Sequence, residues 1–497
     1  MKLTEKLIFA LVIFFGALLR FYFAFIHPVN SDAAWHLSIA ENIAILAHIP
    51  QSDNFRHLPA LWPPPLFHLI AAQLYVITAN FLIMKFLSPI FGVMTLFVSF
   101  LFFRYLYETD VALIATFFLA VFPLHLYFSI ISYTGTAVTF LTVFCCFLFL
   151  RTIFEDSQKM MAMAGISFGL SLLAKATGFA VFFVLIIISG IYYSKEKFKS
   201  SNVVLTMLIG TVIGLTWYLR TYSIYGNPFG PDGFIFGSST SQRNILDNII
   251  TNKSYLIFFK EPHNLLASFW ILTRNSTAIS FITPIVLTLT LLYGLVEVIR
   301  RRNKSDGVLI AIVIVFAATA TLYLLDSLEI HGVRLSLPMI PALSGIIAFG
   351  FSKWFFSRKT KRNYSWRYPL SILFVTLISA SSTYIMFQKT YTVASDIEIV
   401  SNACIWINHY TPDSAKILND GWRDDVEFSS RRYTIYSDKN ADLSQILHKI
   451  QKYNISYLLL QESFGLKEGT IEIIDTSTKF NKIYDSDFTI HIYYFVK

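Results

Sequence analysis

The sequence predicts a polytopic α-helical membrane protein, with about 11 transmembrane helices plus juxtamembrane helices and a small C-terminal α/β domain. Of the 497 residues, 55% are hydrophobic and only 14% are charged, whereas a soluble domain usually carries about 25% charged residues. Residues 389–497 differ from the rest, because they hold 12 Lys and Arg against 15 Asp and Glu. These observations exclude a water-soluble globule and leave room for one soluble domain at the C-terminal end.

Eleven apolar runs are the expected spans. The first, 7–26, follows only Lys2 and Lys6 and has no small-residue cleavage site, so we expect a retained span rather than a signal peptide. Two runs, 160–174 and 177–193, are shorter than the usual ~20 residues. The others are 83–103, 111–128, 134–151, 202–221, 277–299, 307–326, 333–351 and 369–388. A twelfth run, 63–81, begins with prolines and carries polar residues, so it either spans the membrane or lies in the interface.

The basic residues decide between these two topologies. If 63–81 lies in the interface and the N-terminus is inside, the dense basic clusters all fall on the cytoplasmic side, at 195–199, 300–304 and 353–367. If 63–81 spans, these clusters face outward. We therefore expect an integral membrane protein with a cytoplasmic N-terminus, a transmembrane domain 1–388, outer loops 27–82 and 222–276, and an extracytoplasmic domain 389–497. The formal charge of +9 then lies in the membrane part and indicates membrane lipids, not nucleic acid, as its partners.

The C-terminal domain alternates between helix-like and strand-like stretches. Apolar residues recur at helical spacing in 394–411 and in 442–453, whereas 415–420 and 455–460 are short β-rich runs. The run 455–460 (ISYLLL) is almost wholly apolar, which is typical of a buried parallel strand. A small α/β domain follows, in which we expect structural roles for Trp422 and the Arg431–Arg432 pair before any contact with a ligand.

The first outer loop contains a candidate acid. In HPVNSDAAWHLSIAENIA, Asn30 and Ser31 are good helix caps and Asp32 follows in the first turn, where the helix dipole favours a carboxylate. Asp32, Trp35 and His36 share one helical face. An acid and an imidazole at this spacing could act as a base and its partner or bind a metal. On spacing alone, the simpler interpretation is an interfacial helix in which Asp32 only helps to start the helix.

Three basic residues near the outer ends of spans are the second candidate group. Lys175, Arg220 and Arg334 all fall on the outer side in the expected topology. A charge there is costly unless it is paired, and a phosphate group is a suitable partner. The alternative is that each side chain reaches to the interface by itself. The three cysteines suggest neither a disulfide framework nor a metal site.

Histidines in the outer segments are weaker candidates. His57, His68, His125 and His331 could each be ligands, although scattered histidines usually are not, and His331 is kept among the substrate-binding candidates. The chain contains no phosphate-binding glycine loop, no nucleophile elbow and no dinucleotide-binding fingerprint, so work driven by ATP is not expected of it.

The order of these features resembles the GT-C class of membrane glycosyltransferases, in particular the group with the protein O-mannosyltransferases and the aminoarabinose transferases. In that class the first outer loop carries an acid before an interfacial helix, and the stretch from Asp32 to Ala40 is similar. Pro64-Pro65-Leu66 matches a Pro-Pro-Leu element that opens a juxtamembrane helix. Further similar stretches are FPLHLYFS (122–129), LLAKATGF (172–179), WYLRTYSIYGNPF (217–229) and VRLSLPMIPAL (333–343).

The resemblance covers residues 7–351 and implies an inverting transfer of a sugar from a polyprenyl-phosphate carrier to a protein, lipid or glycan acceptor on the outer face. It implies that Asp32 is the general base. It also implies that Arg334 and Lys175 hold the lipid phosphate, with Arg220, His36 and His331 as further substrate-binding residues. The domain 389–497 would then be an accessory that shapes access of the acceptor.

The sequence departs from this pattern at three places. Ala33 stands where many relatives have a second acid, Thr134 and Gly135 stand where many have an acid in the second outer loop, and Trp62-Pro63 replaces a Glu-Lys pair. No cofactor is therefore certain, and a divalent metal bound by Asp32 and His36 stays an open alternative. Two other functions are retained: a flippase or transporter of lipid-linked saccharide, and an inactive scaffold of glycan assembly.

Overall fold

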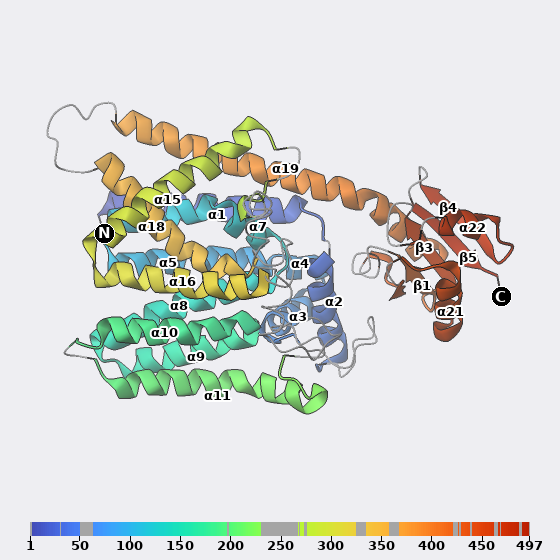
Figure 1. The fold of residues 1–497 in the computed structure, drawn as a ribbon, viewed down its shortest axis with the longest axis horizontal. Coiled ribbons are helices and arrows are strands. Elements are labelled where there is room, and N and C mark those ends of the chain that lie inside the picture. Colours follow the sequence, from blue (N-terminus) through green and yellow to red (C-terminus); the bar gives the residue numbers. More distant parts are fainter. Residues whose placement is uncertain are drawn as a thin grey trace, which may run out of the picture. The chain divides into compact units, whose positions relative to one another are not determined.

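A computed structural model gives the fold of most of the chain (Figure 1). It describes residues 2–29, 31–49, 63–195, 198–229, 267, 269–272, 276–324, 334–356, 367–420, 426, 429–437, 440–461, 466–467, 469–486 and 490–496. The chain forms two compact units. Unit 1 comprises Met1–Ile26, Trp62–Ile70 and Lys85–Lys389, and unit 2 comprises His27–Leu61, Ala71–Met84 and Thr390–Lys497.

Unit 1 is a bundle of long helices that lie side by side (Figure 1). α9 packs between α8 and α11, α8 packs on α5, and α18 packs on both α6 and α15. The helices are α1 (Leu3–Ile26), α5 (Leu87–Leu106), α6 (Thr109–Val121), α7 (Pro123–Ile130), α8 (Thr134–Glu155), α9 (Gln158–Ala174), α10 (Phe179–Tyr192), α11 (Ser200–Tyr225), α15 (Ile282–Arg301), α16 (Lys304–Leu324) and α18 (Ile340–Phe356). Three 3-10 helices join them, η1 (Ala176–Gly178), η3 (Ala278–Phe281) and η4 (Arg334–Met339). α19 (Arg367–Tyr410) contributes residues to both units.

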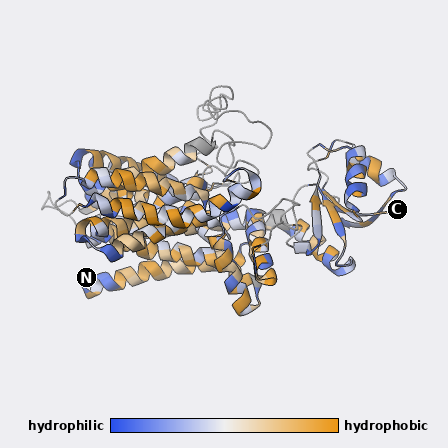
Figure 2. Ribbon diagram, turned by 90° about the horizontal axis from the view of Figure 1, so that it is seen from below, coloured by the Kyte–Doolittle hydropathy of each residue, from blue (hydrophilic) through white to orange (hydrophobic). Residues whose placement is uncertain are grey.

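The predicted helical membrane protein is confirmed, because the described part of each expected apolar run is largely helical. Large apolar side chains on these helices stay exposed, such as Phe14, Leu208 and Ile372, and hydrophobic residues make up much of each helix of the bundle (orange in Figure 2). Within the described residues, seven helices are long and apolar enough to cross a membrane, or eight if the bent pair α6–α7 is one span. The expected count of about 11 spans therefore stays a prediction.

Two runs are folded differently from a simple span. The run 63–81 forms the 13-residue helix α3 (Leu66–Thr78), followed by the short α4 (Phe81–Lys85). At 1.5 Å per residue, α3 is only ~20 Å long, against ~30 Å for a bilayer core, which fits the expected juxtamembrane helix. The run 111–128 is broken between α6 and α7, which meet at 57°. Pro123 begins α7 and cannot donate the helical hydrogen bond that would continue α6.

Glycines let α9 and α11 approach each other closely. Gly165 and Gly169 on α9 face Gly210 and Gly214 on α11, with the same four-residue spacing in both helices. A Cβ atom built on Gly169 would lie 2.6 Å from the Cβ of Ile213, and one on Gly210 would lie 2.1 Å from the ring of Phe168. Membrane helices commonly pack through faces of small residues like these, because the hydrophobic effect does not drive helices together within lipid.

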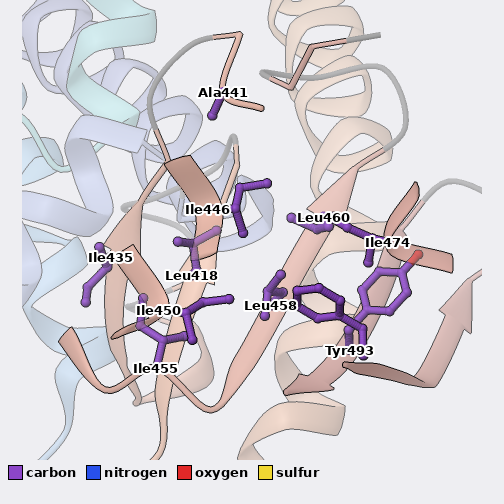
Figure 3. Packing of buried hydrophobic residues seen from close by; sticks show 11 residues of the cluster. Leu418, Ile435, Ala441, Ile446, Ile450, Ile455, Leu458, Leu460, Ile474 and Tyr493 are labelled. Carbon is purple, nitrogen blue, oxygen red and sulfur yellow. The ribbon is translucent and has the colours of Figure 1, made fainter. Parts of the chain in front are cut away.

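Unit 2 contains a five-stranded sheet in the order β2-β1-β3-β5-β4. β1 (Lys416–Asn419) pairs in parallel with β2 (Tyr433–Tyr436) and β3 (Tyr457–Gln461), whereas β5 (Ile490–Phe495) is antiparallel to β3 and to β4 (Phe480–Ser486). Helices α21 (Leu443–Tyr453) and α22 (Thr470–Thr476) share an apolar core with the sheet. Figure 3 shows one apolar core, where Leu418 and Leu458 of the sheet meet Ile446 and Ile450 of α21.

The strands predicted at 415–420 and 455–460 are β1 and β3, and the helix predicted at 442–453 is α21. The predicted buried strand β3 is central, but it is parallel to β1 only.

Arg432 is 4% exposed and donates 2.9 and 2.7 Å hydrogen bonds to the carbonyls of Asn408 and Thr411, at the end of α19. Arg431 forms an ion pair with Glu41 of α2 (Ser31–Leu46). Both arginines therefore have structural contacts, whereas Trp422 lies outside the described residues.

Candidate functional site

Two of the predicted cations meet at one aromatic ring in unit 1. Lys175 caps the C-terminal end of α9, and its Nζ donates a hydrogen bond of 2.6 Å to the hydroxyl of Tyr133. The same Nζ lies 4.3 Å from the centre of the Tyr133 ring, and Cζ of Arg334 lies 5.1 Å from it. Residues from the ends of three different helices therefore form one cluster, which we call the cation site (Tyr133, Lys175 and Arg334).

Tyr133 is held firmly between the helices. Its side chain is 4% exposed, and its ring centre lies 5.6 Å from that of Phe128. The backbone N–H of Tyr133 donates to Oγ of Ser88 at 2.9 Å, and the Ser88 hydroxyl donates to the Tyr133 carbonyl at 3.2 Å. A Cβ atom on Gly135 would lie 3.1 Å from this ring and 3.3 Å from Leu337 of η4. The packing of Tyr133 thus leaves little space for an acidic side chain at position 135.

Two buried hydroxyl groups adjoin the cation site in the sequence. Ser132 is 1% exposed and Thr177 is 4% exposed. In the part of the chain that the structure describes, neither hydroxyl has a hydrogen-bond partner, although buried polar groups normally have one. Lys175 and Arg334 add two cationic donors beside the same ring. The site therefore suits an anion with several acceptor oxygens, and a phosphate group has that chemistry.

The other predicted binding residues lie elsewhere or outside the described residues. Arg220 in α11 stacks on the ring of Trp217, one turn earlier, with Cζ 4.5 Å from the ring centre. His68 is buried in α3, and His125 is buried in α7, where it contacts Arg20. His57 and His331 lie outside the described residues, so their places in the site stay predictions.

The predicted acid lies in unit 2, which is described separately from the cation site. α2 begins at Ser31, so Asp32 falls in its first turn, as predicted. The helix buries Ala33, Ala34 and Leu37, whereas Asp32 is only half-buried. His36 is 4% exposed, and its ring centre lies 5.0 Å from that of Trp35. Asp32 is therefore partly exposed, at the start of a helix that buries most of its other side chains.

A metal ion at Asp32 and His36 would have few ligands among the described side chains. Within the described residues, no three His, Cys, Asp or Glu side chains are grouped so that they could hold a metal ion. One carboxylate and one imidazole are fewer protein ligands than divalent cations usually require.

Sequence reasoning missed two residues of unit 1 that organise this region, Tyr133 and Arg20. Arg20 is completely buried in α1 and donates hydrogen bonds at the break between α6 and α7. The sequence contained a pattern that could have indicated Arg20, because Arg20 is a charge inside the apolar run 7–26 and Pro123 interrupts the run 111–128. Tyr133 had no such signal, since tyrosines are common at the ends of membrane helices.

Comparisons with known proteins identify the fold. No protein-family model matches the sequence, and no curated protein matches it. Among solved structures, it is similar to the oligosaccharyltransferase AglB of Archaeoglobus fulgidus in its apo form, with a TM-score of 0.66 and 13% identity over 93% of this chain and 70% of that one. It is also similar to ArnT of Cupriavidus metallidurans bound to undecaprenyl phosphate, with a TM-score of 0.59 and 12% identity over 99% of this chain and 97% of that one.

A third similar structure is the mycobacterial arabinofuranosyltransferase AftD, with a TM-score of 0.52 and 13% identity over 98% of this chain and 41% of that one. All three are GT-C glycosyltransferases, so the expected resemblance is confirmed at the level of the fold. The chain is an integral membrane protein with a GT-C fold and a small C-terminal sheet.

Proposed function

We propose that this protein is an inverting glycosyltransferase that moves a sugar from a polyprenyl-phosphate carrier to an acceptor hydroxyl or amine on the outer face of the membrane. The observation that carries the proposal is the cation site, where Lys175 and Arg334 converge on Tyr133. The comparisons support the proposal through the GT-C fold, which the chain shares with ArnT bound to undecaprenyl phosphate and with AglB in complex with a dolichol-phosphate.

The reaction is a single displacement at the anomeric carbon. The acceptor oxygen or nitrogen attacks this carbon from the face opposite the phosphate, and the bond from the carbon to the phosphate oxygen breaks, which inverts the configuration. Asp32 takes the proton of the acceptor as the new bond forms. The lipid phosphate leaves with the bonding electron pair and gains negative charge in the transition state.

The cation site stabilises that charge. Arg334 can bind two phosphate oxygens at once, and Lys175 adds a compact positive charge. The Tyr133 hydroxyl accepts a hydrogen bond from Lys175 and so holds the ammonium group in place. Because these groups are already in place before the reaction, little energy is spent on moving them when negative charge develops on the phosphate. The phosphate is a good leaving group, so the reaction needs no nucleotide-binding fold.

The test is mass spectrometry of polyprenyl-phosphate sugars in the native host. Four strains are compared: a deletion, and the deletion complemented with wild type, Asp32→Asn or Lys175→Gln at matched protein levels. We expect a lipid-phosphate sugar to accumulate in the deletion and to clear with wild type. It should remain high with Asp32→Asn, because the amide cannot accept the acceptor's proton, and with Lys175→Gln, because a phosphate contact is lost. The accumulated lipid identifies the donor.

The same strains separate the alternatives. A flippase of lipid-linked saccharide does not need a general base, so Asp32→Asn would clear the lipid as well as wild type does. An inactive scaffold would leave the lipid unchanged even in the deletion. Either result would reject the glycosyltransferase proposal.

A further inference from the structure

Arg20 is a fully buried charge in α1 whose Nη1 and Nη2 groups contact backbone carbonyls and a histidine ring. It is 0% exposed. Nη1 donates to the carbonyls of Gly16 and Ala120 at 2.9 and 3.0 Å. Nη2 lies 3.4 Å from the carbonyl of Leu119 and 2.8 Å from Nδ1 of His125. A guanidinium is expensive to bury in a membrane protein, so these contacts must stabilise an arrangement that the helices alone cannot hold.

That arrangement is the break between α6 and α7. In a continuous helix the carbonyl of Leu119 would accept from the N–H of residue 123, but Pro123 has none. The 57° bend also separates the carbonyl of Ala120 from its helical donor. Inside a membrane such carbonyls need other partners. Arg20 contacts both carbonyls, and at Leu119 it adds to a long hydrogen bond of 3.5 Å from the N–H of Phe122.

Glycines on α1 and α5 make the space for this contact. A Cβ atom on Gly92 would lie 2.9 Å from Nε of Arg20 and 2.6 Å from Oγ of Ser129 in α7. A Cβ atom on Gly16 would lie 2.5 Å from Leu96. Arg20, α5 and α7 are thus packed so closely that one added methyl group at position 92 must displace one of them.

The same helices hold Tyr133. α7 ends at Ile130, and Tyr133 follows three residues later. Ser88, which bonds both backbone polar groups of Tyr133, lies in α5 one turn before Gly92. A shift of α7 against α5 therefore moves Tyr133, and with it the ring on which Lys175 and Arg334 converge.

We propose that Arg20 is a positioning residue of the cation site: it fixes the break between α6 and α7 and so sets the place of Tyr133 between the two cations. Arg20 acts through α7 and does not touch the substrate. This inference rests on the proposed function, in which the cation site binds a lipid phosphate.

The experiment measures the affinity of the purified full-length protein in lipid nanodiscs for undecaprenyl phosphate, together with its unfolding temperature. The first variant is Gly92→Ala, which keeps the charge of Arg20 but adds the methyl group against it. We expect its affinity to fall by roughly tenfold, because small misplacements of binding groups are costly. The matched control is Gly190→Ala in α10, where nothing lies within 4 Å of the added Cβ, and its affinity should stay that of wild type.

A second pair of variants separates positioning from folding. Arg20→Met should lower both the unfolding temperature and the affinity. Adding Pro123→Ala supplies the missing N–H to Leu119 and lets α6 and α7 join, so the double variant should regain unfolding temperature while its affinity stays low. If the affinity returns together with the stability, Arg20 is only a structural residue and the proposal is wrong.

Lys175→Gln in the same assay distinguishes this inference from the proposed function. If Lys175→Gln binds undecaprenyl phosphate as tightly as wild type, the cation site is not the phosphate site and both proposals fail. If Lys175→Gln weakens binding but Gly92→Ala does not, the role of Arg20 alone is overturned.

Discussion

At the scale of single residues, Asp420 shows how burial changes a carboxyl group in the C-terminal domain. It directly follows β1 and is 1% exposed, and its Oδ2 accepts the N–H of Gln461 in β3 at 2.9 Å. Burial raises its pKa to about 8, although the hydrogen bond from Gln461 opposes the shift. In an unfolded chain an aspartate has a pKa of about 3.9. The folded protein therefore holds a proton on Asp420 that the unfolded chain releases.

This difference predicts a pH-dependent stability. Between about pH 4 and pH 8 the folded state binds more protons at Asp420, so its free energy of unfolding falls as the pH rises, by up to about 1.4 kcal/mol per unit. Asp420→Asn removes this proton exchange while keeping the shape of the side chain. Thermal unfolding of both proteins from pH 5 to pH 8 should show the variant gaining stability relative to wild type as the pH increases. A constant difference across this range would contradict the prediction.

The sequence predicted some site residues because each carried its own chemical signal. Asp32 follows helix-capping residues, and Lys175 and Arg334 are charges at the outer ends of apolar runs. The sequence alone could not predict that Lys175 and Arg334 meet at the ring of Tyr133 while Arg220 lies elsewhere. Such a meeting depends on helix packing over long distances in the chain, and Tyr133 itself looks like an ordinary interfacial tyrosine. The roles of all these residues stay predictions until they are tested.

At the scale of elements, the sequence located the helices but not their irregularities. Long apolar runs identify membrane helices because the bilayer imposes one length and one polarity on them. The break at Pro123 has a partner from another helix, because Arg20 of α1 contacts the carbonyls of Leu119 and Ala120. In the C-terminal domain, the patterns of the sequence predicted β1, α21 and β3, whereas β2, β4 and β5 were not predicted.

The paired glycine faces of α9 and α11 lead to a prediction about one element pair. Gly169→Leu should force the helices apart, because even a Cβ atom there would meet Ile213 at 2.6 Å. We expect a loss of unfolding free energy of about 2 kcal/mol or more, as for other overpacked cores. Gly190→Leu in α10 is the control, since that position is open. Comparable unfolding temperatures for the two variants in detergent would show that the close approach is unimportant.

At the scale of the whole molecule, the distribution of charge predicts which side of the membrane each segment occupies. The three cysteines Cys145, Cys146 and Cys404 are buried, so single exposed cysteines can be introduced with little background. A membrane-impermeant maleimide should label Thr478→Cys in intact cells, because the C-terminal domain is expected outside. It should label Lys159→Cys only after permeabilisation, because basic loops are expected inside. The reverse pattern would invert the proposed topology and place Asp32 and the cation site on the cytoplasmic face.

The shortness of α9 and α10 also affects the lipid around them. With 17 and 14 residues, they are only ~26 and ~21 Å long, against a hydrocarbon core of ~30 Å. A mismatch of this size is relieved by thinning the bilayer beside the short helices. Lys175 lies at the end of α9, so lipid headgroups would sink towards it at that place. A polyprenyl carrier could then bring its phosphate to the protein from within the bilayer, without first lifting its chains into water.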